Sequence, residues 1–81
     1  MKTYAKVTKL KPVKVIADAA AFFGPKGAGM TQKEKGDDFI SFEGGGGYVS
    51  VSLCEKDKKL EVNLETREWE AWVERFLENL K

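Results

Sequence analysis

Few residues of this chain have the types and spacing that catalysis needs. The chain has no histidine, so the usual proton shuttle near neutral pH and the commonest zinc ligand are missing. Asp37 and Asp38 are adjacent, and neighbouring side chains on an extended chain point to opposite sides, which suits an acid and base pair poorly. Cys54, the single cysteine, lies beside Glu55 and Asp57, and acidic neighbours do not activate a thiol. We therefore expect no enzyme, no cofactor and no metal site.

A glycine-rich segment is the next candidate. Residues 24–31 differ at one position from the phosphate-loop pattern G-x-x-x-x-G-K-[ST], because Met30 stands where that pattern has its lysine. A loop that follows a helix also has the wrong context, since the pattern needs strand, loop and helix in that order, so we exclude a phosphate loop. The loop from Gly24 to Gly29 contains the stretch Gly24-Pro25-Lys26-Gly27, which resembles the G-x-x-G loop of KH domains. That resemblance implies a clamp on a nucleic-acid backbone. The alternative, which we favour, is a helix cap followed by a loop.

Charge is distributed unevenly along the chain, although the whole carries a net charge of only +1. Residues 1–36 carry eight lysines and two carboxylates, a net charge of +6, whereas residues 37–81 sum to −5. A basic surface can attract nucleic acid. That alternative function would use Lys2, Lys6, Lys9, Lys11, Lys14 and Lys26. We favour the simpler interpretation, in which the two halves neutralise each other inside the fold.

Aromatic and small polar residues supply the other candidate surfaces. Trp69, Trp72 and Phe76 could line a pocket for a small apolar ligand, although we favour the simpler interpretation that they fill the core. Tyr48, Ser50 and Ser52 would form a flat outer sheet face on which a second copy could dock. Our leading prediction is thus a non-catalytic binding or protein-interaction domain of unknown ligand, with a homodimer or a small apolar ligand as its partner.

Alternating polar and apolar residues predict the strands that would position these candidates. We expect strands at residues 2–10, 39–43, 48–54 and 60–65, and the lysines of the first suit a sheet edge. The buried face of the last two should consist of Val49, Val51, Leu53, Leu60, Val62 and Leu64. Residues 28–36 remain open, because strand, helix and disorder are all compatible with them.

Helical spacing predicts two helices. The first begins at Pro12, carries a surface pair of Lys14 and Asp18, and ends at a left-handed Gly24 cap. Its buried face should contain Val13, Val15, Ile16, Ala19, Ala20 and Phe23.

The second helix should run from a Thr66 N-cap to about Leu80. Glu68 and Glu70 in its first turn and Lys81 at its end suit the helix dipole.

Together these elements predict an α+β fold in a single domain over residues 1–81, with one antiparallel sheet of four to five strands and two helices packed on one face. The order is β-α-β-β-β-α, or β-α-β(4)-α if Met30 to Lys35 adds a strand. The longer order is similar to helix-grip and TATA-binding-protein-like topologies. No apolar run approaches the roughly 18 residues of a membrane span, so we expect a cytoplasmic protein with no membrane contact.

Overall fold

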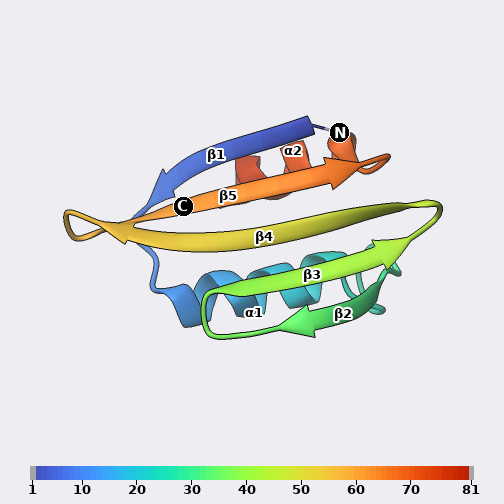
Figure 1. Cartoon of the computed structure of the whole chain (residues 1–81), viewed down its shortest axis with the longest axis horizontal. Helices are drawn as coiled ribbons and strands as arrows, with labels where there is room; N and C mark the ends of the chain where they lie inside the picture. Colours follow the sequence, from blue (N-terminus) through green and yellow to red (C-terminus); the bar gives the residue numbers. More distant parts are fainter. Residues whose placement is uncertain (1, 81) are drawn as a thin grey trace.

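The computed structural model describes residues 2–80. Its elements are β1 (Lys2–Thr8), α1 (Pro12–Phe23), β2 (Thr31–Lys35), β3 (Phe39–Gly44), β4 (Gly47–Lys56), β5 (Lys59–Arg67) and α2 (Glu70–Asn79). The five strands form one sheet in the order β1-β5-β4-β3-β2, and every neighbouring pair is antiparallel (Figure 1). The predicted α+β class and single antiparallel sheet are confirmed, in the longer order that contains a fifth strand. The likeness to helix-grip proteins stays a prediction.

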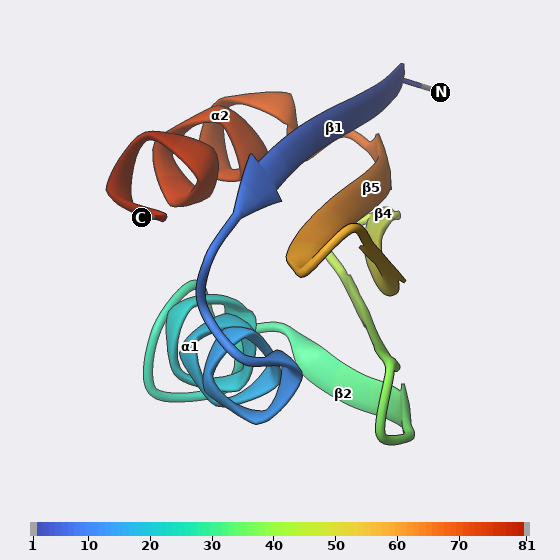
Figure 2. The same cartoon turned by 90° about the vertical axis from the view of Figure 1, so that its left-hand side faces the viewer.

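Both helices cover the same face of the sheet. α1 contacts β3 and α2 contacts β5, and Figure 2 shows the two helices on one side of the twisted strands. The opposite face of the sheet, which is toward the viewer in Figure 1, is covered by no element of residues 2–80.

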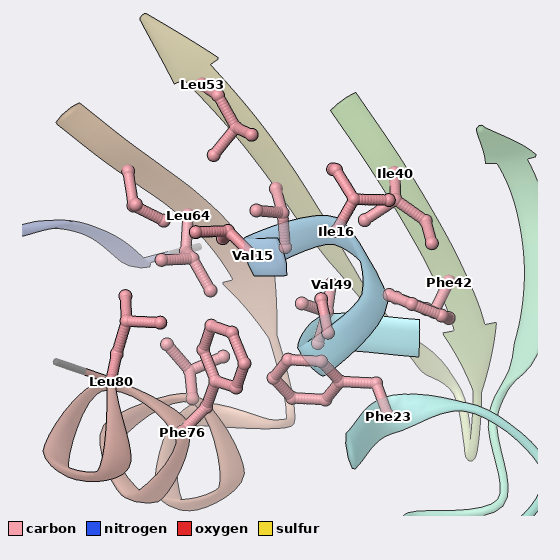
Figure 3. Packing of buried hydrophobic residues seen from close by; sticks show 14 of the residues in the cluster. Val15, Ile16, Phe23, Ile40, Phe42, Val49, Leu53, Leu64, Phe76 and Leu80 are labelled. Atoms are coloured by element: carbon pink, nitrogen blue, oxygen red, sulfur yellow. The ribbon is translucent and has the colours of Figure 1, made fainter. Parts of the chain in front are cut away.

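The core lies between the helices and the sheet. The predicted inner faces of β4 and β5 are confirmed, because their alternate apolar side chains are all buried. Phe23 of α1 and Phe76 of α2 meet above the strands with ring centroids 5.2 Å apart (Figure 3). The buried apolar residues that α1 and α2 contribute, with Leu80 just beyond α2, are Val15, Ile16, Ala19, Phe23, Val73, Phe76 and Leu80.

β2 is a strand that its own sequence would not indicate. All five of its residues are exposed, and its pairing with β3 is interrupted by a bulge between Gln32 and Glu34. The buried Met30 and the exposed edge of β3 hold it in place, since Met30 is almost fully enclosed directly before the strand begins. Pairing with β3, the next strand in the chain, therefore decides the conformation of this segment.

Two expectations about α1 are wrong in detail. Val13 was expected in the core but is 74% exposed, because the helix turns the face of Val15, Ile16 and Ala19 toward the sheet. Gly24 does not adopt the left-handed conformation, since its φ of −69° and ψ of −173° are extended. Glycine is needed there for space, because a Cβ would lie 2.4 Å from the carbonyl oxygen of Ala20. The predicted pair of Lys14 and Asp18 is confirmed at 3.1 Å.

The start of α2 also differs from expectation. Thr66 is not an N-cap: it is fully buried in β5, and its hydroxyl donates a hydrogen bond of 2.8 Å to the carbonyl oxygen of Tyr48. The alternation of β5 continues to Thr66, so its side chain enters the core. Glu68 lies in the intervening turn with a φ of +72°, which leaves Glu70 alone as the acidic residue of the first helical turn. Lys81, expected at the other end, lies outside the described residues.

Candidate functional site

The predicted ligand-binding aromatics hold α2 in place. The indole N–H of Trp69 donates a 2.8 Å hydrogen bond to the carbonyl oxygen of Gly44, at the end of β3. The ring of Trp72 packs edge-on against Phe22 of α1, with centroids 5.6 Å apart. Phe76 is 3% exposed. These contacts connect α2 to the sheet and to α1.

A shallow groove between the two helices is the nearest hollow to these aromatics. It has a volume of about 350 Å³ and is lined by Asp18, Ala21, Phe22, Phe76, Asn79 and Leu80. Phe76 reaches this groove, whereas neither Trp69 nor Trp72 lines it. The structure therefore does not bring the three predicted ligand residues together around one hollow.

The predicted interaction residues do share a surface. Tyr48, Ser50 and Ser52 all project from β4 onto the uncovered side of the sheet, where strand pairing aligns them with neighbours. One row across the strands contains Thr3, Glu65, Ser50 and Ser41, and the next contains Ala5, Asn63, Ser52 and Phe39. We call the uncovered side of the sheet the outer face. A hollow of about 380 Å³ lies over its small residues, between β1 and β4.

Charged and phenolic groups border the small residues of the outer face. The hydroxyl of Tyr48 donates a 2.8 Å hydrogen bond to Glu65, and this bond, with partial burial, raises the pKa of Tyr48. Arg67 is the pairing partner of Tyr48, and Glu61 is the pairing partner of Cys54 at the opposite end of the same strands. Among residues 2–80, neither Arg67 nor Glu61 has an ion-pair partner.

The lysines predicted for nucleic acid are divided among different surroundings. Lys2 lies 3.9 Å from Glu74 of α2, and Lys14 pairs with Asp18. The ammonium of Lys6 donates hydrogen bonds to the carbonyl oxygens of Leu77 and Leu80, so it binds the C-terminal end of α2.

Only two of the predicted lysines remain neighbours at one end of the molecule. Lys9 and Lys11 are exposed in the connection from β1 to α1, whereas Lys26 follows the far end of α1. Sequence analysis missed Lys56, Lys58 and Lys59, because these belong to the acidic half of the chain. No signal short of the strand register would have placed them near Lys9.

The remaining candidates do not form a reactive group of side chains. The glycine loop leads into β2, so the segment after it is a strand where a KH domain has a helix. Asp37 and Asp38 are exposed in the connection from β2 to β3, and Cys54 is exposed on the outer face. Within residues 2–80, no three His, Cys, Asp or Glu side chains gather closely enough to hold a metal ion. Neither of the two described helices has the length and apolar content needed to cross a membrane.

In comparisons with protein-family models, curated proteins and solved structures, the chain matches none of them.

Proposed function

We propose that this chain is a non-catalytic interaction module whose outer face binds the outer face of a second copy. The observation that carries this proposal is the placement of Arg67 and Glu61, two charged residues without ion-pair partners within residues 2–80, three residues to either side of Leu64 on β5. A surface that carries opposite charges at symmetry-related positions is complementary to itself.

The strand register defines the symmetry. Leu64 pairs with Val51 in the middle of the sheet, and Arg67 and Glu61 lie three residues to either side of Leu64. Consider a two-fold axis that lies between the two outer faces and runs perpendicular to the strands at the level of Leu64. This axis would bring Arg67 of one copy opposite Glu61 of the other, and the contact would occur twice in the dimer. The same axis would bring Ser50 opposite Ser52.

The shape of the outer face supports the same pairing. Its two central rows consist mostly of small side chains, which allow two sheets to approach, and face-to-face sheets pack about 10 Å apart with their strands within about 30°. Phe39 and Val7 are both exposed, and such a contact would bury their apolar surface away from solvent. The surface around Trp69 and Trp72 is less favoured as the binding surface, because both indoles already pack within the fold.

The size of the face predicts a weak dimer. Five strands spaced about 4.8 Å apart span about 24 Å, and the outward residues from Tyr48 to Cys54 span about 20 Å, so each partner contributes about 480 Å². A standard interface takes about 800 Å² from each partner. Self-association should therefore be measured up to about 1 mM chain.

Charge reversal tests this arrangement. Sedimentation equilibrium should detect a dimer of the unmodified chain, and Arg67→Glu or Glu61→Arg alone should weaken it at least tenfold, because each variant creates two like-charge contacts. An equimolar mixture of the two variants should restore association, because both contacts in the mixed dimer then join opposite charges. Lys26→Glu and Glu78→Arg are the matched controls, since they make the same charge changes away from the outer face.

Two results would overturn the proposal. One is a chain that sediments as a monomer up to 1 mM. The other is a mixture of the two charge variants that associates no better than either variant alone. Ser52→Arg should also block the dimer, because a large cation would replace a small residue at the centre of the face, and circular dichroism should show that every variant is folded.

A further inference from the structure

The fold gathers exposed lysines from both halves of the chain at one end of the molecule. Lys9 and Lys11 lie in the connection from β1 to α1. At the β4–β5 hairpin, Lys56 ends β4, Lys58 lies in the turn and Lys59 begins β5. Both segments lie at the left of Figure 1, and Figure 2 is viewed from that side. We call these five residues the basic end.

The register shows how closely three of the lysines approach. Lys56 and Lys59 are direct pairing partners, and Lys9 follows Thr8, which pairs with Leu60. Lys9 therefore lies just beyond the end of β1, near Lys59, which directly precedes Leu60 on the neighbouring strand. Like charges directly opposite each other on neighbouring strands destabilise a sheet, so this arrangement opposes folding.

The turn itself contains a second unfavourable choice. Asp57 and Lys58 have φ values of +47° and +67°, the left-handed conformation that a two-residue hairpin turn of this kind requires. Glycine or asparagine adopts that conformation most easily, yet the chain has lysine at the second position. Residues that break local rules without a gain in stability are typical of functional sites.

We propose that the basic end binds the phosphate backbone of a nucleic acid. Its five exposed ammonium groups come from two segments and outnumber the carboxylates of Glu55 and Asp57, which lie among them. Lys35, at the end of β2, lines a hollow together with Lys11, but Asp37 and Glu55 line the same hollow and balance these two charges, so the basic surface consists of the five residues of the basic end. Multiple point charges spread over one end suit a polyanion that offers phosphates at regular intervals.

An anionic membrane is the less favoured partner. The exposed large apolar residues toward this end are Val7 and Phe39 on the outer face, where β5 and β4 separate them, and Val13 on α1 in the opposite layer. Because of these separations, they do not form one apolar surface that could enter a bilayer.

Fluorescence anisotropy with a labelled 20-base-pair duplex and a labelled 20-nucleotide single strand tests the proposal. If all five lysines neutralise duplex phosphates, the logarithmic salt slope is about −4.5, so affinity falls about 500-fold between 50 and 200 mM salt. Lys56→Gln with Lys59→Gln should weaken binding at 50 mM salt at least tenfold and reduce the slope by about 1.8. Lys26→Gln with Lys33→Gln removes the same charge elsewhere and should change affinity less than twofold.

Lys58→Gly adds a second readout that a purely structural turn would not give. This variant should raise the melting temperature, because glycine relieves the left-handed conformation, and it should weaken binding through the lost charge. Arg67→Glu, which tests the dimer, should leave the effect of the two lysine substitutions unchanged. The proposal is overturned by no binding at 20 mM salt, by equal losses in both double variants, or by retention on phosphatidylserine vesicles without retention of either oligonucleotide.

Discussion

Replacing Lys6 by methionine should destabilise the fold, because the Lys6 ammonium caps α2 from a neighbouring strand. It donates hydrogen bonds to the carbonyl oxygen of Leu77 and, at 2.7 Å, to that of Leu80. Carbonyl groups in the last turn of a helix lack the usual partner four residues on and carry the negative end of its dipole. The Leu77 carbonyl also accepts a 3.2 Å hydrogen bond from the backbone N–H of Leu80. Methionine keeps most of the aliphatic stem, so the substitution removes the charge and both hydrogen bonds and little else.

The expected loss can be worked out from these contacts. A hydrogen bond from a charged group contributes about 1.5–3 kcal/mol, and a cation at a helix C-terminus contributes about 0.3–1 kcal/mol. Lys6 is half-exposed, so solvent screens both contributions, and we expect a loss of about 1.5 kcal/mol. For a domain of this size, that loss lowers the melting temperature by about 6–12 °C.

Urea unfolding followed by tryptophan fluorescence measures the change, because Trp69 and Trp72 both belong to the α2 region. Lys26→Met is the matched control, since Lys26 is exposed and forms no ion pair within residues 2–80. The reasoning is refuted if the free energies of unfolding of Lys6→Met and Lys26→Met agree within about 0.3 kcal/mol, the size of an ordinary surface effect.

Three further changes test other contacts. Trp69→Phe removes the donor to the Gly44 carbonyl and should lower the free energy of unfolding in urea by about 1–2 kcal/mol; an unchanged midpoint would contradict the role of that bond. Thr66→Val removes the buried hydroxyl that donates to Tyr48 and should cost about 1–2 kcal/mol without loss of helical circular dichroism; a loss of helix would instead support an N-cap role. Partial burial and, to a smaller extent, the hydrogen bond to Glu74 raise the pKa of Tyr4 to about 12, whereas an unfolded tyrosine titrates near 10. The stability due to Tyr4 is thus complete below pH 10 and is lost as pH rises toward 12. In urea titrations, Tyr4→Phe should therefore lose less stability between about pH 9 and 11.5 than the unmodified chain does. Equal losses in the two proteins would contradict this prediction.

The parts of the fold that were predictable have strong local periodicity. β4, β5 and the body of α2 follow from alternation and from the helical spacing of Val73, Phe76 and Leu80, because side-chain direction along a regular element depends only on residue number. The surface pair on α1 followed for the same reason. Of the candidate surfaces, the shared placement of Tyr48, Ser50 and Ser52 was predictable, because it needs only the alternation of one strand.

The remaining features depend on pairing between strands, not on the periodicity of one segment. β2 has no apolar pattern of its own and is a strand because β3 pairs with it. Thr66 stays in the sheet because pairing with Val49 extends β5 beyond its apolar residues.

The role of each lysine was decided in the same way. Lys6 binds the C-terminal end of α2 because β1 pairs with β5, the strand that precedes α2. For the same reason Lys9 and Lys59 are neighbours, although fifty positions separate them in the chain. The sequence alone thus determined which side chains face inward along each regular element, a property of the local backbone. The tertiary structure alone decided which charges meet, because electrostatic and hydrogen-bonded contacts depend on distance in space, and that distance follows from the order of strands in the sheet.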